Sequence, residues 1–286
     1  MIAGHIEQFD EMSAALRRLV KASASNTCDV ALAMPDSAVV TATIRLPSDL
    51  GATALLRQVE AEVERLSGRS VAVMSFDYSV QRRTQAPGQS AEVEVSIAAA
   101  SQEKVQDWLG LAESAGLKPV VMDVRAEASM LAARRLISAP PVTLGHPVVA
   151  LFQVGSEGAS LHVTHQDEIV HASRKPVDDA LHRDDKNALP AMIKTLADGL
   201  ASDLDALLSA STFRKIDTVL LAADSPLLHG LQEAIKRRTF SDCVVVDPFS
   251  GMSLGQALVG GVFQHEGRAG MLTACGLALR RFHGAC

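Results

Sequence analysis

The segment of this sequence best suited to chemistry is Gly155–Ser156–Glu157–Gly158, which ends a short apolar run. Small residues at a strand end leave backbone N–H groups accessible, so a phosphate could bind there. The glycines would equally suit a plain hairpin, because residues 148–155, 159–164 and 169–172 have the composition of a meander. Its position favours ligand binding, since the segment opens the second half of the chain and precedes a strand–helix pattern.

A second candidate for ligand binding is Ala222–Ala223–Asp224, which we expect to form a loop between a strand at residues 218–222 and a helix. Loops at the carboxyl ends of parallel strands line the ligand crevice of open α/β sheets. Neither G-x-x-x-x-G-K-[ST] nor G-x-G-x-x-G occurs in the chain. Ser156 lacks the G-x-S-x-G surroundings of a nucleophile elbow and has no assignable base. We therefore predict no catalytic residues.

Three histidines, His162, His165 and His171, lie close enough in sequence to suggest a metal site. His162 and His165 are separated by an odd number of residues, so on one continuous strand they would face opposite sides. We therefore favour exposed histidines and predict no metal. The acidic pairs Asp178–Asp179 and Asp184–Asp185 are more typical of a solvated loop than of a catalytic carboxylate pair.

The composition indicates a globular α/β protein large enough for two domains. The chain has 286 residues, of which 48% are hydrophobic and 21% charged. A net charge of -6 and an aromatic content of 3% exclude a typical nucleic-acid-binding surface. We find no signal peptide pattern and no apolar run of about 18 residues, so we expect a cytoplasmic protein without a membrane span. The four scattered cysteines favour buried free thiols.

Hydrophobic periodicity and turn residues predict the elements of the first half. The predicted helices are 9–22, 51–67, one that Ser101 caps and Gly116 stops, and 127–137; the predicted strands are 29–33, 38–46, 74–81, 92–97 and 117–124. Strands 29–33 and 38–46 flank Pro35–Asp36–Ser37, which predicts a hairpin. Alternation in 74–81 and 92–97 predicts antiparallel strands with one buried face.

The second half continues the meander with a strand–helix pattern. The predicted elements are a long helix beginning near Pro190, the strand 218–222, a helix carrying Leu227, Leu231 and Ile235, the strand 244–247 and a closing helix over 272–282. Residues 177–187 are charged and poorly patterned, so we predict a loop there.

Four segments carry a resemblance to a known family. Asp29–Pro47 (DVALAMPDSAVVTATIRLP) resembles a hairpin of the type IV pilus assembly protein PilM family, which is similar to the cell-division protein FtsA and to actin. Val93–Asp123, with AASQEKVQDWLGLAESAGLKPVVMD, is similar to a strand–helix–strand unit of the family. Asp247–Leu254 (DPFSGMSL) and Thr273–Phe282 (TACGLALRRF) match its C-terminal signatures. Together these segments cover much of the chain in the order of the family.

The resemblance implies an α/β, actin-like (ribonuclease H-like) two-domain fold with an FtsA/PilM-type inserted subdomain. It implies a first actin-like half at residues 1–139, with the inserted subdomain at about 29–122, and a second half at 146–286 with a reduced upper lobe. Met1–Ala22 aligns with the part of the family that follows its first phosphate hairpin, so we expect this hairpin to be missing.

The resemblance also implies partners. It indicates a scaffold that binds the cytoplasmic tail of a PilN-like inner-membrane protein, joins the PilN–PilO–PilP pilus alignment complex and thereby associates with the inner-membrane face. We expect an extended peptide to bind beside the segment Asp29–Pro47. An unpaired edge in the first-half sheet would also suit a homodimer.

The chain departs from the family at several positions that would surround a nucleotide. Gln153–Val154–Gly155 stands where the family has Asp-Ile-Gly, and Arg125 stands where it commonly has Glu. Leu221–Ala222–Ala223–Asp224 replaces Leu-Ala-Gly-Gly, and the segment between Pro176 and Leu189 is short. The degenerate nucleotide-binding residues would be Gln153, Gly155, Ser156, Ala222, Ala223 and Asp224.

These departures lead to the hypothesis of a pilus-assembly scaffold that has lost productive ATP binding, with no cofactor expected. Two alternatives stay open at this point. The first is an active actin-like protein that binds ATP with magnesium and has a further N-terminal segment. The second is a related scaffold of type II secretion or DNA uptake, similar to GspL.

Overall fold

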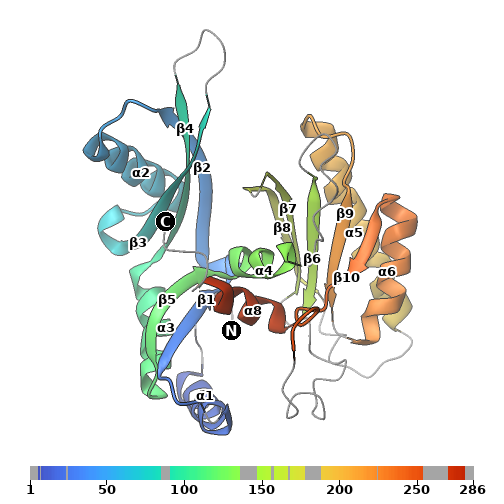
Figure 1. The fold of residues 1–286 in the computed structure, drawn as a ribbon, viewed down its shortest axis with the longest axis horizontal. Coiled ribbons are helices and arrows are strands. Elements are labelled where there is room, and N and C mark those ends of the chain that lie inside the picture. The colour runs from blue at the N-terminus through green and yellow to red at the C-terminus, as the bar shows by residue number, and fades with distance from the viewer. Residues whose placement is uncertain are drawn as a thin grey trace. The chain divides into compact units, whose positions relative to one another are not determined.

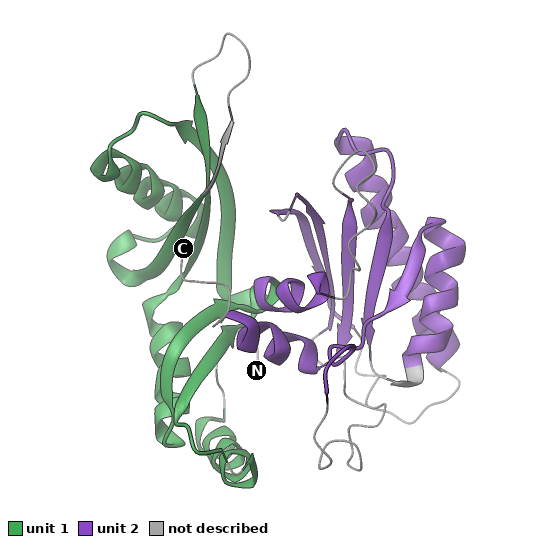
Figure 2. Cartoon of the chain, viewed as in Figure 1, with its two compact units in different colours: residues 1–126, 281–286 green, residues 127–280 purple. Residues whose placement is uncertain are grey.

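The computed structural model divides the chain into two compact units (Figures 1 and 2), residues 1–126 with 281–286 (unit 1) and residues 127–280 (unit 2). It describes residues 6, 8–23, 25–84, 91–135, 147–155, 158–166, 168–177, 188–223, 225–253 and 270–280. The domain boundary predicted between residues 139 and 146 lies outside the described residues, as does the loop predicted at residues 177–187 except for its first residue. Within the described residues, no helix is both long enough and apolar enough to span a bilayer.

Unit 1 contains two separate sheets. Its elements are α1 (Phe9–Ser23), β1 (Asp29–Met34), the 3-10 turn η1 (Asp36–Ala38), β2 (Val39–Pro47), α2 (Ala52–Ser67), the 3-10 turn η2 (Val71–Val73), β3 (Met74–Thr84), β4 (Glu92–Ser101), α3 (Gln102–Ser114) and β5 (Lys118–Val124). β1 and β5 form a parallel pair, and β2, β4 and β3 form an antiparallel sheet in that order.

The three-stranded sheet buries one face against α2 (Figure 1). The alternating residues Val93, Val95 and Ile97 of β4 are buried there, together with Val59 and Val63 of α2. Gly68 ends α2 in the left-handed conformation with φ +64°, and Ser101 caps α3 by accepting a hydrogen bond from the N–H of Lys104 at 3.4 Å. The predicted helices and antiparallel strands of this region are confirmed.

The predicted hairpin within Asp29–Pro47 is wrong, although both of its strands form. β1 pairs in parallel with β5, while β2 pairs with β4 in the other sheet. The intervening segment runs from an extended Pro35 into a 3-10 turn, and this geometry does not return the chain along itself as a two-residue hairpin turn would. Asp36 instead accepts a hydrogen bond from the backbone N–H of Ala126 at 3.0 Å.

Unit 2 is a five-stranded mixed sheet with helices on both faces (Figure 1). Its elements are α4 (Arg125–Arg134), whose first two residues belong to unit 1, β6 (Val149–Gly155), β7 (Gly158–His165), β8 (Glu168–Lys175), α5 (Ala188–Ala210), β9 (Thr218–Ala223), α6 (Ser225–Thr239), β10 (Asp242–Val245) and α8 (Met271–Arg280). The sheet order is β10-β9-β6-β7-β8, with the meander β6-β7-β8 antiparallel and β6, β9 and β10 parallel. The predicted meander is confirmed.

Alternate residues of β6 supply two hydrophobic cores. Ala150, Phe152 and Val154 pack with the apolar side chains of α5 and α6, whereas Val149 and Leu151 pack with those of α4 and α8. Because both faces of the central strands are covered, side chains there are buried whatever their polarity. The expectation of exposed histidines is therefore wrong for His162 of β7, which is 4% exposed.

The burial of each cysteine likewise depends on its position in the fold. Cys243 in β10 is buried as predicted, but Cys28 is exposed because it lies before β1 rather than inside a core. Cys275 on α8 is half-buried. Burial raises the pKa of the Cys243 thiol to about 11.

Candidate functional site

The two segments singled out for ligand binding meet at one edge of the unit 2 sheet. β6 and β9 run in parallel, with Gln153 opposite Ala222 and Val154 opposite Ala223. Their carboxyl ends therefore place Gln153, Gly155, Ala222 and Ala223 together, and we call these four residues the strand-end site. Ser156 and Asp224 lie outside the described residues.

A buried series of hydrogen bonds orients the side chain of Gln153. Its amide Nε2 donates to the Ser129 hydroxyl of α4 at 3.4 Å, and this hydroxyl lies 2.7 Å from Thr273 Oγ1 of α8. Ser129 is fully buried, so these hydrogen bonds satisfy polar groups that water cannot reach. The Gln153 side chain is thereby oriented by two helices, but it adds no negative charge to the strand-end site.

Of the two glycines at the β6–β7 turn, the structure requires glycine only at position 158. Gly158 has φ +119°, and a Cβ there would lie 2.6 Å from the carbonyl oxygen of Lys175, so both backbone conformation and packing require it. Gly155 has no positive φ, and apart from its chain neighbours a Cβ there would meet no atom of the described residues within 4 Å. The hairpin therefore explains Gly158, whereas Gly155 leaves open space at the end of β6.

The expected loop at Ala222–Asp224 is wrong for its first two residues, because β9 continues through Ala223. Ala222 is buried among side chains of α4 and α8, and Ala223 is buried in the core on the side of α5 and α6. The two methyl groups therefore have packing roles within unit 2. Any influence of these alanines on a ligand would act through the backbone of β9.

Arg125, the residue of reversed charge, is paired within unit 1. Its guanidinium Nη2 lies 3.2 Å from Asp36 Oδ2, while the other carboxylate oxygen of Asp36 accepts the N–H of Ala126. Both charged side chains are mostly buried, at 24% and 19% exposed, so the pair holds the segment after β1 against the start of α4.

A pocket of about 260 Å³ lies in unit 1 beside the segment Asp29–Pro47. Its lining comes from the start of β2, the end of β4, the start of β3 and the adjoining ends of α2 and α3. We call it the unit 1 pocket; its lining residues are Ser37, Ala38, Val39, Val40, Leu66, Ser67, Arg69, Met74, Ala99, Ala100, Ser101, Glu103 and Lys104. Seven of the thirteen lining residues are apolar, while Arg69, Glu103 and Lys104 provide charge.

The segment Asp29–Pro47, beside which the sequence predicts peptide binding, lines the unit 1 pocket with residues 37–40, but the contributions of α2 and β4 were not predicted. The run Ala98–Ala99–Ala100 at the end of a strand was the available signal, since small residues let other groups approach closely. Among the described strands, β2 is also an edge of its sheet. A pocket of mixed polarity in a unit that also has an exposed strand edge suits an extended peptide.

Comparison with known proteins identifies the fold. The chain matches the model of the family described as type IV pilus assembly protein PilM over residues 1–178 and 180–282. A solved PilM–PilN type IV pilus biogenesis complex is 19% identical with a TM-score of 0.79, and the match covers 98% of this chain and 87% of that chain. At this identity the likeness shows the fold, and the predicted α/β, actin-like fold class is confirmed.

A weaker likeness links the chain to the cytoplasmic domain of EpsL, an inner membrane component of the type II secretion system of Vibrio cholerae. It is 10% identical with a TM-score of 0.45, and the match covers 96% of this chain and 82% of that chain.

Proposed function

Since the chain belongs to the family of type IV pilus assembly protein PilM, we propose that it is a cytoplasmic scaffold of pilus assembly that binds the tail of a PilN-like inner-membrane protein. The family match over nearly the whole chain supports a role in pilus assembly. The solved relative in complex with PilN makes a PilN-like protein the partner to test.

The unit 1 pocket is the proposed peptide-binding site. Its apolar lining residues would contact one or two hydrophobic side chains of an extended segment, and its charged residues would select the flanking side chains. Preformed pockets of this kind require little rearrangement, which favours binding of a short tail.

Trp108 offers a direct test, because it is the single tryptophan of the chain. It packs against the cluster that contains Ala38 and Ala100, two lining residues of the unit 1 pocket. We expect the cytoplasmic tail of a PilN-like protein, added as a synthetic peptide, to change Trp108 fluorescence saturably. A peptide of the same composition in scrambled order should not.

The matched variants are Ser37→Arg and Gln106→Arg. Ser37 is an exposed lining residue, so an arginine there should obstruct the unit 1 pocket and weaken peptide affinity by roughly tenfold or more. Gln106 is exposed on α3 and outside the lining, so its variant adds the same charge without obstruction. Equal affinities for the two variants, or no response to any PilN-like tail, would contradict the proposal.

A further inference from the structure

The wall of the unit 1 pocket at residues 37–40 begins where the chain passes from one sheet of unit 1 to the other. The pairing of β1 with β5 ends at Met34, and the pairing of β2 with β4 begins at Val39. The turn η1 between them is closed by a backbone hydrogen bond from the N–H of Ala38 to the carbonyl of Pro35 at 2.8 Å. A short segment between two sheets has few backbone hydrogen bonds, so its position depends on side-chain contacts.

Asp36, the residue directly before this wall, supplies such a contact with both oxygens of its carboxylate. Oδ1 accepts a hydrogen bond from the backbone N–H of Ala126 at 3.0 Å, and Oδ2 lies 3.2 Å from Nη2 of Arg125. Both donors belong to the first turn of α4, where backbone N–H groups lack partners within the helix and a negative charge is favourable. Asp36 therefore caps a helix that begins about 90 residues later in the chain.

The helix that Asp36 contacts is itself fixed by core packing. Met130, Ala132 and Ala133 of α4 are buried in a hydrophobic core of unit 2. The side chains of Asp36 and Arg125 are mostly buried, so water weakens their interaction less than it would weaken an exposed ion pair. The carboxylate thus holds the start of the pocket wall against an anchored element.

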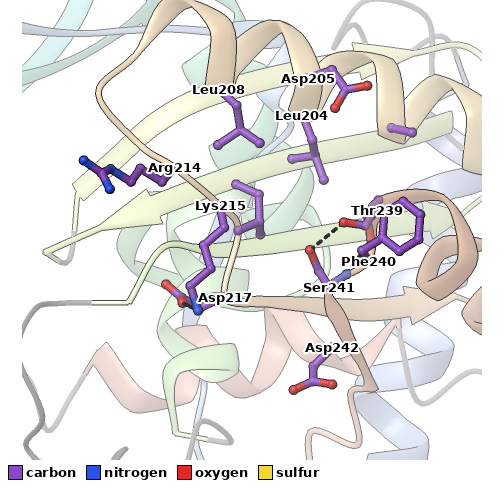
Figure 3. Close-up of a pocket in the computed structure, with 12 residues that line it drawn as sticks. Leu204, Asp205, Leu208, Arg214, Lys215, Asp217, Thr239, Phe240, Ser241 and Asp242 are labelled. Carbon is purple, nitrogen blue, oxygen red and sulfur yellow. Dashed lines mark hydrogen bonds and ion pairs between the residues drawn. The ribbon is translucent and has the colours of Figure 1, made fainter.

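A pocket of unit 2 shows that such a distant contact is not a general requirement of pocket walls. This pocket, of about 350 Å³, lies at the amino ends of β9 and β10, and polar and charged side chains form most of its lining (Figure 3). Its two loop segments are held by contacts between near neighbours in sequence. Lys215 Nζ lies 2.8 Å from Asp217 Oδ1, and the hydroxyl of Ser241 donates to the carbonyl of Thr239 at 3.3 Å.

We propose that Asp36 is the positioning residue of the unit 1 pocket, whose carboxylate sets the wall at residues 37–40 in the place that a bound PilN-like tail requires. This inference rests on the proposed function and deepens it, because Asp36 lies outside the lining and acts through it. Ser37 is the next residue and an exposed lining residue. Ala38, also in the lining, packs in the cluster that contains Trp108.

The affinity of the synthetic tail peptide, followed by Trp108 fluorescence, tests the proposal. We expect Asp36→Ala to weaken binding by roughly tenfold or more, because it removes both contacts with α4. Asp36→Asn should weaken binding less, since its amide oxygen can still accept the N–H of Ala126. Asp49→Asn removes an exposed carboxylate of unit 1 outside the lining and should leave the affinity unchanged. Equal affinities of the unmodified chain and Asp36→Ala would overturn the proposal.

A double-mutant cycle tests whether the ion pair with Arg125 contributes to this positioning. Asp36→Asn and Arg125→Gln each remove the same ion pair. The double variant should therefore bind the tail no more weakly than the weaker of the two single variants. Additive losses would mean that the two residues act separately, which contradicts the proposal.

Hydrogen exchange without any peptide separates this inference from the proposed function. The amides of residues 37–40 should exchange faster in Asp36→Ala than in the unmodified chain, whereas those of α2, which also lines the pocket, should not. Unchanged exchange at residues 37–40 would overturn the inference whether or not the tail binds. Faster exchange there in a chain whose unmodified form binds no PilN-like tail would contradict the proposed function and leave Asp36 as the residue that sets the pocket wall.

Discussion

Gln153 is the single residue that most affects what the strand-end site can bind. Magnesium bound with a nucleotide is usually held through one or two carboxylates together with phosphate oxygens. The Gln153 amide is neutral, and its nitrogen is already engaged with Ser129. The side chain therefore cannot supply the charge that an aspartate would supply at the end of β6.

We predict that calorimetric titration of the chain with ATP will show no magnesium-dependent binding in the micromolar range. The physical reason is the missing carboxylate at Gln153, combined with a β9 end whose alanines serve core packing. Binding of micromolar affinity that requires magnesium would contradict this prediction and favour an active actin-like protein.

Gly155→Ala tests whether any heat of ATP binding arises at the strand-end site. A methyl group there meets no neighbour in the part of the chain that the structure describes, so the variant should fold with an unchanged melting temperature. A signal that disappears in Gly155→Ala would locate the nucleotide at the strand-end site, whereas a signal that persists would locate it elsewhere.

At the scale of the element, β8 is an edge strand tied to its covering helix by one carboxylate. Asp203 of α5 accepts from the Lys175 ammonium and from the Ser173 hydroxyl, each at 2.7 Å. Lys175 also donates to the carbonyl of Gly199 at 3.0 Å. Burial tends to raise the pKa of Asp203, but the hydrogen bonds from Lys175 and Ser173 outweigh it, and the pKa is lowered overall.

We predict that Asp203→Asn lowers the free energy of unfolding at pH 7 by roughly 1 kcal/mol, a modest value because Lys175 is 47% exposed to screening solvent. A lowered pKa means that the carboxylate stabilises the fold above its unfolded pKa of about 3.9 and loses this effect as pH falls through the folded value. The difference between wild type and variant should therefore shrink between pH 5 and the acid limit of folding.

Urea unfolding at a series of pH values measures this difference. Asp49→Asn, which neutralises an exposed carboxylate of unit 1, is the control and should show little effect. A difference for Asp203→Asn that stays constant down to pH 3 would mean that the charge of Asp203 is not what anchors β8.

At the scale of the whole molecule, each unit has hydrophobic cores of its own. The clusters around Val95 and Met34 belong to unit 1, and those around Leu151 and Leu221 belong to unit 2. Domains with separate cores can unfold in separate transitions. Trp108 reports on unit 1 alone.

We predict that Gly276→Ala destabilises unit 2 by about 1–3 kcal/mol, because a Cβ on this α8 residue would overlap the carbonyl oxygen of Ala128 in α4. The urea midpoint followed by far-UV circular dichroism should fall, while the Trp108 fluorescence transition should not move. Gly110→Ala in α3 is the reciprocal variant. A methyl group there meets open space, so the Trp108 transition should rise. Equal shifts of both signals would show that the units unfold together.

Much of this protein could be read from local sequence patterns. Alternation identified the buried face of β4, and the residues Ser101 and Gly68 located helix ends, because pleat and capping geometry depend on neighbours along the chain. The order of motifs identified the family, which the match across the chain confirms.

Pairing between distant segments was decided by the tertiary structure alone. The pattern of Asp29–Pro47 showed two strands but not that β1 pairs with β5, because a strand carries no local signal of its partner. The family resemblance grouped Gln153 with Ala222, but only the folded sheet shows them as paired neighbours on β6 and β9, and only the packing of α8 on α4 explains Gly276. Local chemistry determines which elements form, whereas long-range burial determines which residues become neighbours and so which of them can share a site.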